Sequence, residues 1–119
     1  MSKHNARVTL AQVEEFVLEV EGYIGKETLE SLLEDRLRCR AFERVMGCIG
    51  EAVKRLPMSL REANPEVDWK GAAGLRDWVS HGYDGLDYLV LWKAAREQLP
   101  GLLAVVRRMQ AHLDSEPPA

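Results

Sequence analysis

Helical periodicity is the feature of this sequence that most limits its fold. Apolar residues recur three or four positions apart in nearly every segment, and no segment alternates apolar and polar residues as a half-buried strand does. Helices of this kind, joined by short connections, bury their apolar faces by packing side by side. The sequence therefore predicts an all-α protein, an antiparallel bundle of about five helices.

Capping and helix-breaking residues predict where these helices begin and end. Thr9 can cap a first helix that runs to about Glu21, with Gly22 or Gly25 following its end. One face of this helix is predicted to be apolar, with Leu10, Val13, Val17 and Val20. Pro100 lacks the amide hydrogen that a continuous helix needs, so the last helix is expected to break near Leu99 and restart. The further helices are expected at residues 26–35, 37–56, 69–80 and 86–113, with a polar connector at 58–68.

The expected helix that ends before Pro57 carries two glycines. Gly47 and Gly50 present no side chain, so a neighbouring helix should approach closely there. The inward face of the helix is predicted to be one stripe of apolar residues, Leu37, Ala41, Val45, Cys48, Ile49, Ala52 and Leu56.

Chain length predicts one domain. The chain has 119 residues, enough for folding to bury roughly two thirds of its unfolded surface. Residues 1–113 are expected to form this domain, and residues 114–119 a disordered tail. The longest apolar run is far shorter than the roughly 20 residues of a membrane span, and the N-terminus lacks a signal-peptide pattern. We expect a cytoplasmic protein with no membrane contact.

The two cysteines fit a reducing compartment. Cys39 and Cys48 are nine positions apart in one expected helix, which places them about 180° apart around its axis. This offset disfavours a disulfide or a shared metal ion between them. Both are predicted to be buried thiols.

Charge is distributed unevenly along the chain. The net charge of −3 excludes a protein that binds nucleic acid through a large cationic field. Arg36, Arg40 and Arg44 nevertheless recur at every fourth position and form one stripe on a helix. Two interpretations stay open: a solvated face paired with nearby glutamates, or a contact surface for RNA phosphates or for an acidic partner.

The segment RDWVSHGYDG, residues 76–85, departs from ordinary helical composition. It brings Arg76, His81 and Tyr83 together at the end of a helical run. On an uninterrupted helix Arg76 and Tyr83 would share a face, whereas His81 would lie about 140° away from Arg76. For the three side chains to converge, the helix must end near Gly82 or a second chain must contribute.

These side chains suit cleavage of RNA without a metal ion. Attack by the 2′-hydroxyl needs a group to accept its proton, a group to protonate the leaving oxygen, and a cation for the charge on phosphorus. Histidine serves the proton transfers near neutral pH and arginine serves the phosphate. No metal or cofactor is expected, because His81 has no second histidine or cysteine at ligand spacing. The alternative is a structural, hydrogen-bonded His81 at a helix end.

Residues 76–83 also resemble a known family. The order Arg76, a polar residue, three variable residues, His81, one variable residue and Tyr83 is similar to the motif of the HepT-like toxins of the HEPN ribonuclease superfamily. The likeness covers about residues 44–103. The flanking segments resemble the family in the same order: IGEAVKRLP at 49–57, NPEVDWKGAAGLRD at 64–77 and GLDYLVLWKAAREQLPGLL at 85–103.

The resemblance implies a homodimeric helical bundle with two motifs facing one another across a cleft. It implies a metal-independent endoribonuclease that acts as the toxin beside a nucleotidyltransferase antitoxin of the MNT type. Arg76 would bind the scissile phosphate, His81 would be the general acid or base, and Asp77 would orient a catalytic side chain. Tyr83 would be the residue that the antitoxin adenylylates, a modification also called AMPylation.

A second class of function stays open. The same scaffold could be a non-catalytic helical interaction module that binds a nucleotidyltransferase partner. That hypothesis predicts tight partner binding without cleavage, whereas the ribonuclease hypothesis predicts cleavage that a folded His81→Ala variant loses. The overall acidity favours the module, and the presence of both Arg76 and His81 favours the enzyme.

Overall fold

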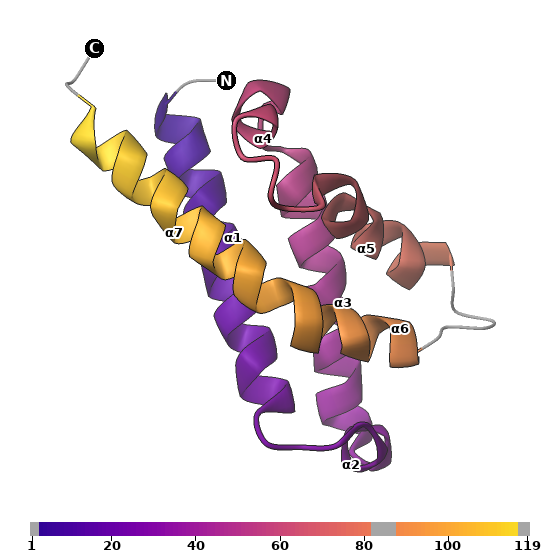
Figure 1. Cartoon of the computed structure of the whole chain (residues 1–119). Helices are drawn as coiled ribbons and strands as arrows, with labels where there is room; N and C mark the ends of the chain where they lie inside the picture. Colours follow the sequence, from indigo (N-terminus) through magenta and orange to yellow (C-terminus); the bar gives the residue numbers. More distant parts are fainter. Residues whose placement is uncertain (1–2, 82–87, 117–119) are drawn as a thin grey trace.

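The computed structural model describes residues 3–81 and 88–116, and all regular structure in these two ranges is helical (Figure 1). The all-α class predicted from the periodicity is confirmed. The elements are α1 (Lys3–Ile24), α2 (Leu29–Glu34), α3 (Arg36–Lys54), α4 (Met58–Glu62), α5 (Trp69–His81), α6 (Tyr88–Lys93), a π-helical segment η1 (Ala94–Gln98) and α7 (Leu99–Ser115).

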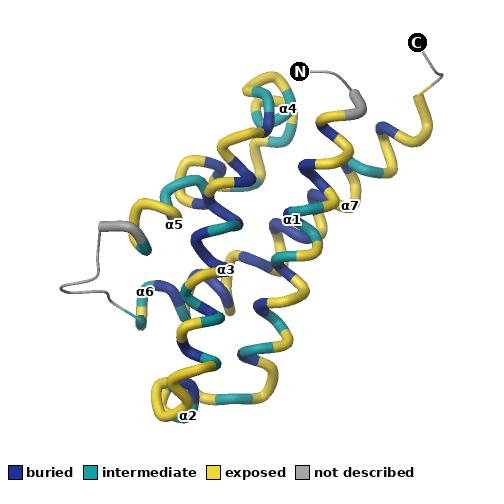
Figure 2. The backbone as a smooth tube through the Cα atoms, turned by 180° about the vertical axis from the view of Figure 1, so that it is seen from behind, coloured by how far each residue is buried: buried dark blue, intermediate teal, exposed yellow. Residues whose placement is uncertain are grey.

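The long helices lie side by side and run antiparallel. α1 packs against both α3 and α7, and α5 packs against α3 (Figures 1 and 2). The first residues of α1 and the last residues of α7 lie at the same end of the molecule (Figure 1). The described residues hold more helices than the five expected, because the connector contains α4 and the last helix is divided into α6, η1 and α7.

The core is built from the inward faces of these long helices. Leu10, Val13, Val17 and Val20 have no exposed surface, which confirms the predicted apolar face of the first helix. Figure 2 shows the buried positions of α1 and α3 facing one another. Full burial of each such side chain contributes about 1.5–3 kcal/mol, so the inward stripe accounts for the antiparallel packing.

The first helix begins earlier than its sequence suggests. Thr9 lies inside α1 and is 4% exposed, so the prediction that it caps the helix was wrong. The buried face continues back to Ala6, and Arg7 donates from Nη2 to the carbonyl oxygen of Leu113 at 2.8 Å. Packing on α7 therefore extends α1 past a residue that would otherwise favour a cap. At the other end, Gly25 follows the helix with a φ of 35°, as predicted.

The inward face of α3 was predicted only in part. Val45, Ile49, Ala52 and Leu56 are buried, as expected. Leu37 is 84% exposed, so its assignment to the core was wrong. The core-facing residue of that first turn is Cys39, and two positions on a helix are about 200° apart, which directs Leu37 to the opposite side.

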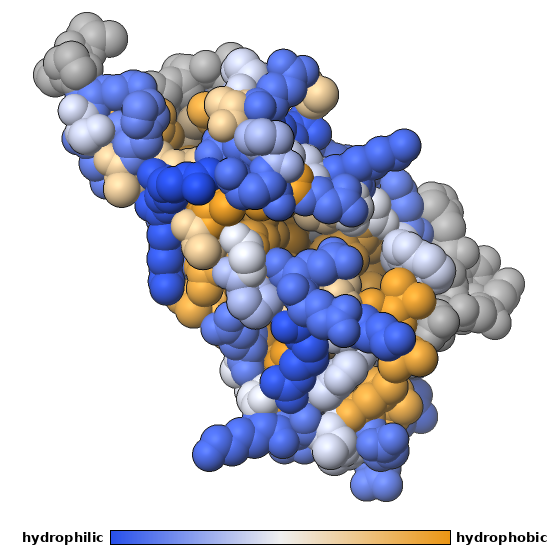
Figure 3. Space-filling model, viewed as in Figure 1, coloured by the Kyte–Doolittle hydropathy of each residue, from blue (hydrophilic) through white to orange (hydrophobic). Residues whose placement is uncertain are grey.

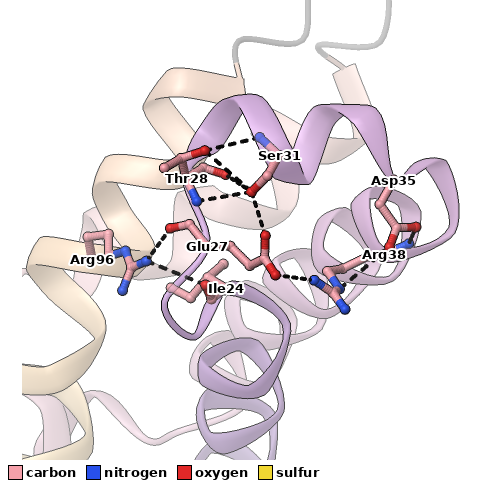
Figure 4. Close-up of polar contacts among 7 residues, drawn as sticks. All are labelled: Ile24, Glu27, Thr28, Ser31, Asp35, Arg38 and Arg96. Atoms are coloured by element: carbon pink, nitrogen blue, oxygen red, sulfur yellow. Dashed lines mark hydrogen bonds and ion pairs between the residues drawn. The ribbon is translucent and has the colours of Figure 1, made fainter.

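A polar cluster fixes the corner between α1, α2 and α3 (Figure 4). The second helix starts at Leu29 instead of the expected Lys26, because Thr28 and Ser31 form a reciprocal capping box. The Glu27 carboxylate accepts from Ser31 at 2.5 Å and from Arg38 at 2.8 Å. These bonds join the loop after α1 to the first turns of α2 and α3.

Arg96 attaches the same corner to the C-terminal half of the chain. Its Nη2 donates to the carbonyl oxygen of Glu27 at 2.8 Å and to that of Ile24 at 3.4 Å (Figure 4). Its guanidinium also lies 4.8 Å from the centre of the Trp92 ring. Because carbonyls at a helix end have no partner within the helix, this cation stabilises the end of α1.

The segment expected to be a polar connector contains one helical turn. Pro57 precedes α4 in extended conformation, with φ −61° and ψ 144°, and Met58–Glu62 follow as helix. The chain then returns to α5, where Trp69 Nε1 donates to the carbonyl oxygen of Asn64 at 2.8 Å. This bond ties the start of α5 to the connector.

The last helix adapts to Pro100 without a loop. An α-helix would need a proline amide hydrogen for the carbonyl of Arg96, and the proline ring would clash with that carbonyl. The chain instead widens into η1, where the Leu99 amide bonds to the carbonyl of Ala94. The predicted break near Leu99 is therefore a π turn. α7 continues to Ser115, so residues 114 and 115 belong to the helix.

No helix within residues 3–81 and 88–116 is long and apolar enough to cross a membrane. Both cysteines are free thiols in the described chain. Cys39 is buried as predicted, whereas Cys48 is partly exposed.

Candidate active site

The candidate site lies on the seam between α3 and α5, and glycines set the distance between these helices. A Cβ atom on Gly50 would lie 2.5 Å from the backbone nitrogen of Arg76 and 2.9 Å from the carbonyl oxygen of Ala73. A Cβ on Gly47 would lie 3.5 Å from Val79. The predicted close approach is confirmed, and it places the backbone of Arg76 directly against α3.

Two ion pairs cross this seam. Arg76 Nε lies 3.9 Å from Glu51 Oε2, and Asp77 Oδ1 lies 3.5 Å from Lys54 Nζ. The Arg76 side chain is 45% exposed and that of Glu51 is 54% exposed. Exposed pairs at such distances contribute little, typically about 0–1 kcal/mol. The guanidinium of Arg76 is therefore accessible to an anionic ligand.

Glu51 and Lys54 were not identified from the sequence as site residues. Both fall in the segment IGEAVKRLP, and they follow Gly50, the point of close contact, by one and four positions. The signal that could have found them is their spacing. Charged residues about one turn apart, next to a glycine that lets another helix approach, can pair with charged side chains of that helix.

His81 is the last residue of α5, as the sequence predicted for a residue before Gly82. Arg76 and His81 are thus five positions apart in one helix, about 140° around its axis. The helix does not end between them. The side-chain position of His81 and the whole of Tyr83 lie outside the described residues.

The three arginines of the predicted stripe are all exposed along α3. Arg40 Nη1 lies 3.3 Å from Glu43 Oε2. Arg36 and Arg44 make no ion pair within residues 3–81 and 88–116. The interpretation as a solvated face paired with glutamates therefore holds for Arg40. The guanidinium groups of Arg36 and Arg44 are exposed to solvent in the described part of the chain.

Glu43 also joins α3 to the first residue of α6. The Tyr88 hydroxyl donates to Glu43 Oε2 at 2.8 Å. Burial raises the pKa of Tyr88, and the neighbouring Glu43 and Cys39 raise it further. Tyr88 keeps its proton, so this hydrogen bond fixes the start of α6 after the motif segment. Glu43 and Tyr88 are 45 positions apart, so no local sequence pattern indicated this contact.

Within the described chain, no group of three or more histidine, cysteine, aspartate or glutamate side chains is placed to hold a metal ion. The polar groups that do converge at the seam are one guanidinium, one ammonium and two carboxylates, from Arg76, Lys54, Glu51 and Asp77. Such a set can bind a phosphate through its cations and orient a neighbouring group through its carboxylates.

Comparison with known proteins confirms the family resemblance. The family described as Ribonuclease HepT-like matches residues 13–109. A Thermococcus cleftensis protein named "Probable ribonuclease HepT" is 32% identical over 100 residues, which are 84% of this chain and 91% of its own.

Two further relatives carry the name "Putative RNase". One, from Caldanaerobacter subterraneus subsp. tengcongensis, is 38% identical over 82 residues, 69% of this chain and 73% of its own. The other, from Methanocaldococcus jannaschii, is 29% identical over 116 residues, 98% of this chain and 96% of its own. No solved structure matches the chain. The family match spans most of the chain and includes the whole α3–α5 seam, so this protein belongs to the Ribonuclease HepT-like family.

Proposed function

We propose that this protein is an endoribonuclease that cleaves RNA without a metal ion. The observation that carries the proposal is the placement of Arg76 and Asp77, which match the family's motif, on the exposed side of the α3–α5 seam. In the reaction the 2′-oxygen attacks phosphorus and loses its proton to a base. The bond from phosphorus to the 5′-oxygen breaks, that oxygen gains a proton, and a 2′,3′-cyclic phosphate remains.

Arg76 is the phosphate-binding residue in this proposal. Its guanidinium is half exposed, and its contact with Glu51 at 3.9 Å is long for an ion pair. A phosphate oxygen would bond more strongly, because a charge-assisted hydrogen bond forms at about 2.7–2.9 Å. Negative charge that develops on phosphorus in the transition state would be stabilised in the same way.

His81 is the proposed general acid or base, and Asp77 the residue that orients a catalytic side chain. His81 ends α5, where the partial negative charge of the helix terminus favours a protonated imidazole. Asp77 lies four positions before it and is held by Lys54 at 3.5 Å. The carboxylate is thus fixed one helical turn from the position of the proton-transfer residue.

A homodimer would complete the site. Arg76 and His81 occupy backbone positions about 140° apart around the axis of one continuous helix. A second copy would supply the missing partner across a shared cleft. Exposed Trp78, between these two motif residues, is the kind of aromatic residue enriched at protein interfaces.

The biological role that we propose is the toxin of a HepT/MNT-type toxin–antitoxin pair. The antitoxin would be a nucleotidyltransferase that adenylylates Tyr83, adding phosphate charge and bulk beside the cleft. Exposed Arg36, Arg40 and Arg44 would contact RNA or this partner.

The decisive experiment is incubation of purified protein with a structured RNA in EDTA, beside His81→Ala and Arg76→Ala. The products are tested for 2′,3′-cyclic phosphate ends, and thermal unfolding verifies that each variant folds. We expect cyclic ends from the wild type alone. Intact RNA with wild-type protein that mass spectrometry shows to be unmodified would favour the non-catalytic module that binds a nucleotidyltransferase.

A further inference from the structure

Two hollows flank α5, and their charges are opposite. The first, of about 710 Å³, is lined by Lys54, Arg61 and Lys70 together with Glu62 and Asp77. The second, of about 490 Å³, lies between α5 and the η1–α7 helix, and its lining is mostly apolar (Figure 3). Its charged residues are all acidic, Glu66, Asp68 and Glu97, with no lysine or arginine of the described chain among them. A polyanion that reaches α5 is attracted to the first hollow and repelled by the second.

The first hollow, which we call the basic groove, continues directly from the candidate active site. Asp77 and Lys54 belong to both. The side of α5 that lines the groove carries Lys70, Gly74 and Asp77, and the next turn of the same helix ends at His81. The groove therefore begins one residue from Arg76, at the Asp77–Lys54 pair that it shares with the candidate site.

The floor of the basic groove suits a nucleobase. Pro65, Trp69 and Ala73 give it an apolar surface, and Met58, 58% exposed, stands at its edge. Gly74 leaves space, since a Cβ atom there would have no other atom within 4 Å. Flat bases bind on apolar surfaces while their phosphates meet cations at the rim.

The cations at the rim are available for this role. Lys70 is exposed and makes no ion pair or side-chain hydrogen bond within the two described ranges. The Arg61 guanidinium donates from Nε to the carbonyl oxygen of Leu56 at 3.1 Å, which keeps it beside the groove. The third cation, Lys54, forms the ion pair with Asp77 at 3.5 Å.

We propose that the basic groove binds the nucleotide of single-stranded RNA next to the scissile phosphate, with Lys70 contacting a phosphate and the floor receiving the base. This inference rests on the proposed ribonuclease function. It extends the site from the reacting phosphate to a flanking nucleotide, so it predicts that binding depends on residues that take no part in bond cleavage.

Two variants test the groove, each with a matched control. Lys70→Gln removes the unpaired charge, and Lys26→Gln removes an exposed lysine at the opposite end of the molecule. Gly74→Leu fills the basic groove, and Gly101→Leu fills the acidic hollow, where a Cβ also meets nothing within 4 Å. Leucine is favoured over glycine in a helix, so both leucine variants should fold.

Binding is measured by fluorescence anisotropy with a labelled 2′-O-methyl RNA, which has no nucleophile and is not cleaved. We expect Lys70→Gln to weaken binding by about 3- to 10-fold and to reduce the salt slope by roughly 0.7. Gly74→Leu should weaken it at least as much, while both controls stay within about twofold. In cleavage assays the groove variants should raise KM and leave kcat nearly unchanged.

The outcomes separate this inference from the function on which it rests. If the wild type cleaves RNA and Lys70→Gln and Gly74→Leu bind RNA with wild-type affinity, the proposal that the groove binds RNA is wrong and the proposed ribonuclease function is unaffected. Failure of the wild type both to bind and to cleave RNA overturns both. Retained RNA binding with loss of nucleotidyltransferase binding in the groove variants would show a protein-docking surface and would also overturn the inference.

Discussion

The backbone nitrogen of Arg76 lies 2.5 Å from the point where a Cβ atom on Gly50 would stand. Gly50→Ala must therefore push α5 away from α3, because backbone atoms cannot yield as a flexible side chain can. We expect a loss of about 1–3 kcal/mol in the free energy of unfolding, measured by urea denaturation. Ribonuclease activity should fall even under conditions in which the variant is fully folded, since the displaced helix carries Arg76.

Gly22→Ala is the matched control for this change. Gly22 lies inside α1, and a Cβ atom there would meet nothing within 4 Å. Alanine is preferred over glycine in a helix, so this variant should gain roughly 0.5–1 kcal/mol. Equal effects of the two substitutions would contradict the close packing of α3 on α5.

Removing the carboxylate of Glu51 should strengthen RNA binding. Glu51 lies 3.9 Å from Arg76 and competes with phosphate for its guanidinium. We expect Glu51→Gln to lower the Kd for a non-cleavable RNA by about two- to fivefold, the range that an exposed ion pair of 0–1 kcal/mol allows. Glu15→Gln is the control, because it changes the net charge by the same amount on the exposed surface of α1. If Glu15→Gln lowered the Kd equally, the effect of Glu51→Gln would be one of overall charge and not of competition for Arg76.

The hydrogen bond from Tyr88 to Glu43 should make stability fall at alkaline pH. Burial raises the pKa of Tyr88 above its ordinary value of about 10. The unfolded chain then loses this proton at lower pH than the native protein, so the contribution is complete below about pH 10 and declines as pH rises further. The free-energy difference between wild type and Tyr88→Phe should shrink from pH 8.5 to pH 11 in urea titrations. A constant difference would contradict the partly buried, protonated hydroxyl.

The corner carboxylate predicts the opposite dependence in acid. Hydrogen bonds from Ser31 and Arg38 lower the pKa of Glu27. Its contribution is therefore present above the ordinary glutamate pKa of about 4.3 and is lost as pH falls through the lower native value. Glu27→Gln should be less stable than wild type at pH 6.5, and thermal unfolding at pH 3 should show a smaller gap. Glu15→Gln should show no such convergence.

Prediction of the fold succeeded where local pattern and tertiary packing agree. The buried face of α1 and the close approach at the two glycines of α3 do not depend on which helix packs there. Both could therefore be inferred from the spacing of residues alone. Thr9 failed as a cap because α7 offers α1 a surface that continues beyond it. Leu37 failed as a core residue because Cys39, about 200° away around the helix axis, takes the core side of that turn.

Prediction of the candidate site divides along the same line. Arg76 and Asp77 could be proposed from the sequence because they lie in a short linear motif, and their roles stay predictions. Glu51 and Lys54 were missed because they reach the site only through the crossing of two helices. Glu43 was missed for a related reason, since it meets Tyr88 from 45 positions away. Roles that depend on such contacts follow from the packing and cannot be obtained from either segment alone.

The widened turn at η1 has a consequence for how the chain tolerates change. A π turn holds about one residue more than an α turn, so the helix on either side of it keeps nearly the same rotation about the axis. A one-residue deletion within Ala94–Gln98 would therefore restore ordinary turns and leave Tyr88 on the side of Glu43, whereas the same deletion in an ordinary α-helical turn would rotate the preceding residues by about 100°. The restored turn would also set the Pro100 ring against a carbonyl. η1 is therefore an adapter that accommodates Pro100 without changing the side that α6 presents to α3.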